Sequence, residues 1–134
     1  INDRVPPFSP LICYEVIFPG HVTDKANRPA WLVNVTNDAW YGHTAGPYQH
    51  LEITRMRAIE EGLPLARAAN TGISAMFDGY GRVTARLALG ERGAITTPLP
   101  PALPPTVYSR MGDAPFGALL LVFLAAGLWT WRKA

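Results

Sequence analysis

The stretch from Ala114 to Trp131 constrains this chain most, because "APFGALLLVFLAAGLWTW" contains no charged residue. A helix that rises about 1.5 Å per residue would extend this stretch over roughly 27 Å, just enough to cross the hydrocarbon core of a bilayer. Apolar side chains would occupy all sides of the helix, and a chain of 134 residues is too short to bury it in a core. The sequence therefore predicts one membrane-spanning helix over residues 114–131.

The residues that follow this helix predict its orientation. Trp129 and Trp131 stand where indole rings favour the headgroup layer, and Arg132 and Lys133 come directly after them. Basic residues that flank a span are enriched on the cytoplasmic side of the membrane. We therefore expect residues 132–134 to form a cytoplasmic tail and residues 1 to about 110 to lie on the other face.

A proline-rich segment precedes the predicted span. "PLPPALPPT", residues 98–106, cannot pair into a sheet or continue a helix, and it favours an extended polyproline conformation. We predict that residues 98–113 form a stiff strap, which connects a globular domain over residues 1–97 to the membrane helix.

The globular part alternates strand and helix patterns. An apolar run ends at Cys13, and Ala30–Asp38 is apolar enough for a strand covered on both faces. Apolar residues then follow helical spacing between Pro47 and Gly62. The remaining strands are predicted at 73–77 and 83–87, which form a hairpin around "DGYG", and at 93–97. The pattern predicts an α/β fold that contains part of a larger sheet.

Composition excludes several classes of function. The formal net charge of +2 is small and the arginines are scattered, so no nucleic-acid partner is expected. One cysteine rules out an internal disulfide and a cysteine-rich zinc site. His21, His43 and His50 do not fall into a zinc-binding pattern. We therefore expect neither a metal nor another cofactor, and a monomer is the default expectation.

Two segments carry candidate functional residues. Cys13 stands at the end of a predicted strand, where a nucleophile can be held rigidly beside a cleft, but a small buried apolar residue fits the same position. Glu15 follows closely and by itself is as typical of a solvated surface carboxylate. Asn37-Asp38 is typical of a turn, and the Trp40-Tyr41 pair suits either the core or the apolar wall of a ligand site.

Three stretches together resemble one family. These are "ICYEVIFP", "WLVNVTNDAWYGHTAGPYQHLEITRMRAIEEGLPLARAANTGISAMFDGYGRV" and "TVYSRMGD" before the final apolar run. They are similar to the bacterial apolipoprotein N-acyltransferases, membrane members of the nitrilase (carbon–nitrogen hydrolase) superfamily. Members of that superfamily fold as a four-layered αββα sandwich and use a Glu–Lys–Cys triad. The resemblance implies that Cys13 is the nucleophile, that Tyr14 and Glu15 support it, and that Trp40 and Tyr41 contact the substrate or have a structural role.

The resemblance also implies a reaction and its partners. A thiolate would attack an acyl ester of a phospholipid, and the resulting thioester would pass its acyl chain to the α-amino group of a diacylglyceryl-cysteine apolipoprotein. A thioester preserves acyl reactivity, and an amine competes with water when the cleft is dry. The expected location is the bacterial inner membrane, with several spans in the complete protein and the catalytic domain on the periplasmic side.

The chain departs from the family pattern in one respect. The triad's glutamate and lysine precede the cysteine in the family, but neither residue type occurs before Cys13 here. Lys25 follows the cysteine and Lys133 flanks the predicted span, so neither matches the family's lysine. We expect this chain to be the C-terminal part of a longer enzyme and to be inactive alone. Two alternatives remain at this stage, a membrane-anchored nitrilase-type amidase and a non-catalytic membrane-tethered binding module.

Overall fold

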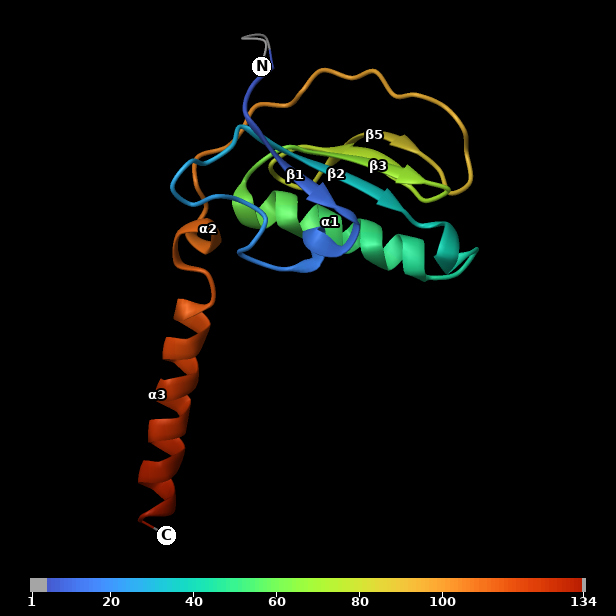
Figure 1. Ribbon diagram of the computed structural model, residues 1–134. Coiled ribbons are helices and arrows are strands. Elements are labelled where there is room, and N and C mark those ends of the chain that lie inside the picture. The colour runs from blue at the N-terminus through green and yellow to red at the C-terminus, as the bar shows by residue number, and fades with distance from the viewer. Residues whose placement is uncertain (1–4, 134) are drawn as a thin grey trace.

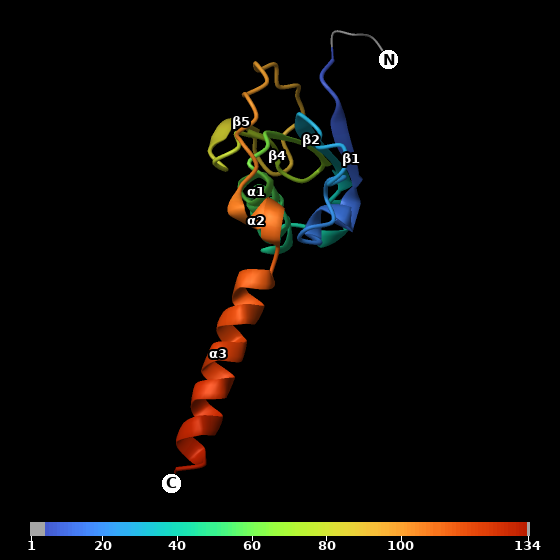
Figure 2. The same cartoon turned by 90° about the vertical axis from the view of Figure 1, so that its left-hand side faces the viewer.

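The computed structural model describes residues 5–133. Its elements follow one another along the chain as β1 (Phe8–Ile12), η1 (Cys13–Ile17), β2 (Trp31–Asn37), η2 (Ala39–Tyr41), α1 (Gly46–Glu61), β3 (Leu65–Asn70), β4 (Ser74–Phe77), β5 (Val83–Leu87), α2 (Val107–Met111) and α3 (Ala114–Trp131), where η denotes a 3-10 helix. Figures 1 and 2 show a layered α/β body from which α3 projects as a separate rod. The predicted α/β class is confirmed.

The body is built on one mixed sheet with the strand order β1-β2-β3-β4-β5. β1, β2 and β3 are parallel, whereas β4 and β5 continue the sheet as antiparallel strands. The connection from β2 to β3 runs through α1, which lies against one face of the sheet in Figure 1. Parallel neighbours require such a crossover, and it brings the carboxyl ends of β1 and β2 to the same edge as the start of α1.

The apolar core fills the space between this face of the sheet and the helices. It is formed by side chains from the strands, from α1, from η1 and from the connecting segments, namely Leu11, Val16, Val22, Leu32, Leu51, Ala58, Leu63, Leu65, Ile73, Ala75 and Phe77. Polar side chains share the buried face of α1 with the apolar ones, among them His50 and Thr54. Since a buried polar group is costly unless it is hydrogen-bonded, these side chains need hydrogen-bond partners inside the domain.

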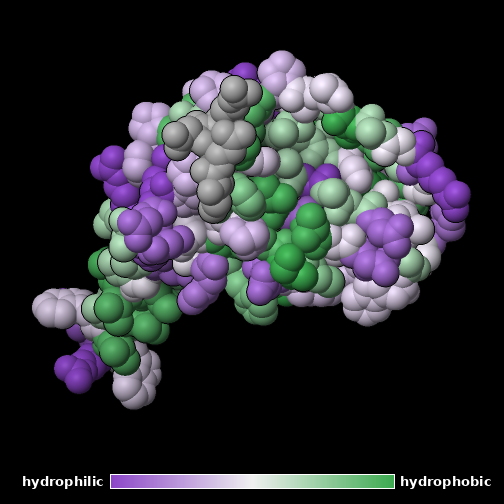
Figure 3. Space-filling model, turned by 45° about the horizontal axis from the view of Figure 1, so that its top comes forward, coloured by the Kyte–Doolittle hydropathy of each residue, from purple (hydrophilic) through white to green (hydrophobic). Residues whose placement is uncertain are grey.

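The opposite face of the sheet is covered by a single stretch of chain. Figure 1 shows residues 88–105 arching from the end of β5 across this face to α2. A hollow of about 290 Å³ lies between this stretch and strand residues such as Val33, Ala68 and Met76. Figure 3 shows apolar side chains exposed on this side of the molecule.

Two expectations about strands were wrong. Residues 93–97 form no strand, because Gly93, Ala94, Ile95 and Thr97 line the hollow over the sheet face instead of pairing with an edge. A strand at Leu65–Asn70 was not expected, yet it lies in the centre of the sheet between β2 and β4. The helix after Pro47 and the hairpin of β4 and β5 are confirmed.

The proline-rich segment is fastened to the C-terminal end of α1. Arg28 Nη2 donates to the carbonyl of Glu61 at 2.8 Å and to that of Leu103 at 3.0 Å. The amide of Leu103 donates to the carbonyl of Gly62 at 2.9 Å, and the Thr106 hydroxyl donates to the carbonyl of Glu60. These donors satisfy carbonyls that a helix terminus otherwise leaves unpaired. The segment is therefore a docked part of the domain.

α3 matches the predicted membrane helix in its bounds. It is the one helix within residues 5–133 that is long and apolar enough to cross a membrane, judged by its length and composition. Its side chains are exposed along its whole length, and Figure 1 shows no other element beside it. An exposed helix of this composition needs an apolar surrounding, because water disfavours contact with so much apolar surface.

Gly62 offers a test of how the proline-rich segment is docked. Its φ of +64° lies in the left-handed region, and a Cβ would stand 3.1 Å from Thr106 Cγ2 and 3.2 Å from the Pro104 carbonyl oxygen. We predict that Gly62→Ala lowers the free energy of unfolding by more than the ~1–2 kcal/mol of a left-handed alanine. Gly20→Ala is the matched control, since Gly20 has a φ of +72° in a tight turn and no atom within 4 Å of the position of a Cβ. Denaturation of both variants in detergent micelles measures the difference, and equal losses would contradict the docking contact.

Candidate active site

Cys13 begins a strained turn at the end of β1. Its φ is +51°, in the left-handed region that non-glycine residues rarely occupy, and the 3-10 helix η1 starts at the same residue. A backbone held in this region costs about 1–2 kcal/mol and persists only where its surroundings fix it. A strained turn between a strand and a helix also presents its side chain away from both elements, as in other nucleophile-bearing turns. The side chain of Cys13 is half-buried. Its expected position at a strand end is confirmed.

Two side chains fix this turn. The Glu15 carboxylate accepts the amide of Ile12 at 2.6 Å, which closes the turn from its C-terminal side. Asn34 lies opposite on β2, fully buried, and its Nδ2 donates to the carbonyls of Leu11 at 3.1 Å and Cys13 at 3.3 Å. The backbone on both sides of the strained residue is therefore held.

Asn34 is oriented in turn by a buried arginine. Arg67 on β3 is 3% exposed, and its Nη1 donates to Asn34 Oδ1 and, at 3.1 Å, to Thr54 Oγ1. Its Nη2 donates to Asp38 Oδ2 at 2.6 Å, and its Nε donates to the Ile73 carbonyl at 3.3 Å. Burial lowers the pKa of Arg67, and the charge of Asp38 opposes that effect. Each nitrogen of this guanidinium thus has an acceptor, as a buried charge requires.

His50 completes this buried group. Its Nδ1 lies 3.0 Å from Asp38 Oδ1 and 3.1 Å from Arg67 Nη2. Burial and, next, the charge of Arg67 lower the pKa of His50, while Asp38 and the nearby Cys13 carbonyl act in the opposite direction. Its Nε2 has no hydrogen-bond partner within residues 5–133. We name Asn34, Asp38, His50 and Arg67 the polar network.

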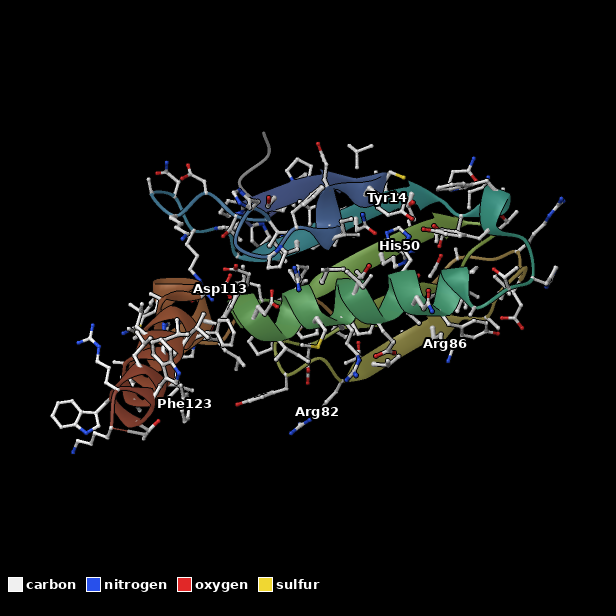
Figure 4. The ribbon with its side chains drawn as sticks, turned by 90° about the horizontal axis from the view of Figure 1, so that it is seen from below. Tyr14, His50, Arg82, Arg86, Asp113 and Phe123 are labelled. Atoms are coloured by element: carbon white, nitrogen blue, oxygen red, sulfur yellow. The ribbon has the colours of Figure 1, made fainter. Side chains whose placement is uncertain are left out.

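Aromatic side chains cover the outer side of His50. The Tyr14 ring stacks on the imidazole at 5.2 Å between centroids with planes 15° apart, and Figure 4 shows the two side by side. The Tyr14 hydroxyl is hydrogen-bonded to that of Tyr41. Trp40 stacks on Tyr41 at 4.7 Å and remains 69% exposed. Tyr14, Trp40 and Tyr41 thus form an aromatic cluster with a free outer surface, and burial raises the pKa of Tyr41.

The structure brings most of the expected site residues together. Tyr14, the residue after Cys13, packs against the Trp40 ring and is hydrogen-bonded to the Tyr41 hydroxyl, and both of these residues lie on η2. Glu15 contacts the backbone of the same turn. The polar network was missed, apart from Asp38, which was expected only to turn the chain. A signal existed at Arg67, a lone arginine between small apolar residues in "PLARAAN".

Neither lysine joins this site. Lys25 lines a different pocket with Arg28 and Arg110, and Lys133 lies over the Trp129 ring at the end of α3. Within the described part of the chain, no group of three or more His, Cys, Asp or Glu side chains could hold a metal ion. The arrangement offers a half-buried thiol on a rigid turn beside an aromatic surface.

Comparison with known proteins assigns the class. The carbon-nitrogen hydrolase family profile matches residues 4–103, and the chain belongs to that family. A CN-hydrolase superfamily protein from Xanthomonas campestris has the same fold, with a TM-score of 0.60 and 20% identity over 90% of this chain and 48% of its own. An amidase from Nesterenkonia sp. gives a TM-score of 0.50 and 25% identity over 66% of this chain and 39% of its own.

Closer sequence relatives carry one name. Proteins named apolipoprotein N-acyltransferase are 58% identical in Bradyrhizobium diazoefficiens over 92% of this chain, and 53% identical in Rhodopseudomonas palustris over 97% of it. The chain spans 23% and 24% of the length of these two relatives. The expected resemblance to the apolipoprotein N-acyltransferases is confirmed.

Removing the buried guanidinium tests the polar network. Arg67→Met leaves Asp38 buried without its cation, and we predict a loss of about 3–5 kcal/mol in the free energy of unfolding. Arg55→Met is the control, because Arg55 and Glu52 form an exposed pair and such pairs contribute about 0–1 kcal/mol. Adding Asp38→Asn to Arg67→Met completes a double-mutant cycle, which we expect to be strongly non-additive. Similar losses for Arg67→Met and Arg55→Met would contradict this account.

The lowered pKa of His50 predicts a dependence of stability on pH. Below the ordinary histidine value of 6.5 the unfolded chain binds a proton that the folded chain does not, so stability falls as the pH falls below that value. We predict that His50→Gln reduces this slope in urea titrations between pH 7 and roughly pH 5. His43→Gln, at an exposed position, is the control variant with which the slope is compared. The same slope in wild type and His50→Gln would refute the assignment.

Proposed function

We propose that the complete protein containing this chain is a membrane N-acyltransferase whose nucleophile is Cys13. The observation that carries the proposal is the strained turn at Cys13, found in a chain 58% identical to a protein named apolipoprotein N-acyltransferase. A non-catalytic binding module would not need a thiol on a fixed left-handed turn. Nor would it need a buried guanidinium group that braces this turn through Asn34.

The proposed reaction has two steps. A base removes the Cys13 proton, and the sulfur attacks the ester carbonyl of a phospholipid acyl chain. The ester C–O bond breaks, the lysophospholipid leaves with a proton on its oxygen, and a thioester remains on Cys13. The α-amino group of a diacylglyceryl-cysteine apolipoprotein then attacks the thioester, loses a proton, and forms an amide as the thiol is restored.

The membrane helix and the aromatic cluster support a lipid donor. α3, if it spans a bilayer, holds the domain in the same layer as phospholipids and lipid-modified proteins and raises their effective concentration. Trp40 and Tyr41 present an apolar surface beside Cys13 that suits an acyl chain. Tyr14 and Glu15 support the reaction by shaping the turn and its aromatic cover. We place the domain on the periplasmic side of the inner membrane, in a complete protein with several spans.

The general base and the cation of the triad are proposed to come from residues outside this chain. Glu15, the carboxylate nearest in sequence, is engaged by the Ile12 amide, and His50 is buried beneath Tyr14. Lys25 and Lys133 lie elsewhere. We therefore infer that the chain of residues 1–134 is inactive by itself and that the complete protein supplies a glutamate and a lysine beside the thiol.

Amide hydrolysis is the second candidate, because the fold is shared with an amidase at 25% identity. Both reactions would use Cys13, and they differ in the acyl donor. A phospholipid donor is favoured by the exposed apolar helix and by the relatives' names.

Labelling of the complete protein distinguishes these candidates. We predict that a phospholipid with a labelled acyl chain transfers its label to Cys13 as a thioester, which hydroxylamine releases because thioesters are reactive toward amines. Cys13→Ala is expected to abolish labelling. A small acyl amide serves as the competing donor in a parallel reaction.

The possible outcomes separate the hypotheses. Label from the amide but not from the phospholipid would support the amidase and refute the lipid donor. Label that persists in Cys13→Ala would refute Cys13 as the nucleophile. The same measurement on the chain of residues 1–134 is expected to give no thioester, and labelling there would contradict the need for partners from outside it.

A further inference from the structure

A second pocket lies at the end of α1 that is remote from Cys13. It has a volume of about 490 Å³ and lies between the 23–28 segment, the C-terminal end of α1 and α2. Its lining includes three cationic residues and two carboxylates, together with three other residues, namely Lys25, Arg28, Arg110, Asp24, Glu61, Thr23, Pro105 and Ser109. The side chains of Lys25 and Arg110 are exposed.

The three cations of this pocket outnumber its two carboxylates. Within residues 5–133, neither Lys25 nor Arg28 nor Arg110 forms an ion pair. Asp24 and Glu61 direct hydrogen bonds elsewhere, since Asp24 accepts Ala26 N at 2.8 Å and Asn27 Nδ2 at 3.0 Å, and Glu61 accepts the Thr23 hydroxyl at 3.2 Å. Their charges leave the pocket with an excess of one positive charge.

One hydrogen-bond donor of the Arg28 side chain is unpaired within residues 5–133. Its Nη2 is shared between the Glu61 and Leu103 carbonyls, but its buried Nε has no partner in the described part of the chain. A buried donor without an acceptor is unfavourable, so an additional acceptor at this position would stabilise the site.

The pocket stands at the entry to the membrane helix. Arg110 is in the last turn of α2, and α3 begins at Ala114. In Figures 1 and 2, α2 joins the domain to α3. With α3 in a bilayer, the cations lie near the headgroup layer, where lipid phosphates are concentrated. We propose that this pocket binds the phosphate group of an anionic phospholipid headgroup.

The lipid bound there is distinct from the acyl donor. His50, which stacks beneath Tyr14 beside Cys13, lies eleven positions before Glu61 on α1, or roughly 16 Å along the helix. The phosphate and the ester carbonyl of one phospholipid are only a few bonds apart. A lipid whose phosphate is held in the pocket therefore cannot bring its ester to Cys13, and it serves to anchor the domain at the surface.

Native mass spectrometry of the complete protein in detergent micelles tests this site. The probe is phosphatidylglycerol, titrated against wild type and Lys25→Gln/Arg110→Gln. Each cation near an anionic surface contributes about fivefold in affinity, so we expect the double variant to weaken retention roughly 25-fold. Neither side chain makes a hydrogen bond within residues 5–133, so the variant should fold, which circular dichroism verifies.

Arg82→Gln/Arg86→Gln is the matched control. It removes the same charge from exposed positions beside and on β5, away from Asp113 at the start of α3, as Figure 4 shows. We expect its retention of phosphatidylglycerol to equal that of wild type.

Equal weakening by both double variants would overturn the proposal, as would equal retention of a diacylglycerol, which lacks a phosphate. Displacement of the lipid by millimolar inorganic phosphate would also overturn it, since it would mark a general anion site. The readout is retention of a lipid and requires no acyl transfer, so failure of the proposed reaction would not affect it.

Discussion

The guanidinium group of Arg67 is the interaction on which the rest of the domain depends. It lies in the centre of the sheet and bonds to Asn34 on β2, to Asp38 beyond it, to Thr54 on α1 and to the carbonyl of Ile73 before β4. Four segments of the chain thus meet at one buried cation. Its five N–H donors lie in a fixed plane, so each partner is held in direction as well as in distance.

This arrangement gives the domain positional accuracy at a cost in stability. A buried ion pair loses hydration that its mutual attraction only partly replaces, and an apolar cluster of the same volume is often as stable. Apolar contacts, unlike hydrogen bonds, do not fix the orientation of the side chains that make them. Through Arg67, the amide of Asn34 is oriented to donate to the Cys13 carbonyl, and so the left-handed residue is held by bonds that begin in the core. The buried charge of Arg67 therefore stabilises the strained turn at Cys13 through Asn34.

The sequence predicted those features that follow from local pattern. The helix after Pro47, the β4–β5 hairpin and the position of Cys13 at a strand end are all determined by residues close in the chain. The central strand β3 was missed because "LARAAN" carries an arginine where a buried strand usually has only apolar residues. Arg67 is acceptable there only because Asp38 and Asn34 lie next to it in space, at a distance in sequence that no periodicity reveals. The strand expected at 93–97 also depended on residues distant in sequence. A strand forms only where it can pair with the edge of a sheet, and these residues lie over the face of the sheet instead.

α1 connects the two ends of the molecule. Near its N-terminal end, His50 packs under Tyr14 beside the Cys13 turn, and at its C-terminal end Arg28 and Thr106 tie the carbonyls of its last residues to the proline-rich segment. A helix is stiff along its axis, whereas a flexible linker would leave the domain free to tumble above its anchor. Because the segment before α3 is bonded to the same helix that supports the thiol turn, the position of α3 in a membrane would determine the height of Cys13 above it. The docked segment and the polar network then serve the same end, which is to hold one sulfur atom at a defined place relative to a lipid surface.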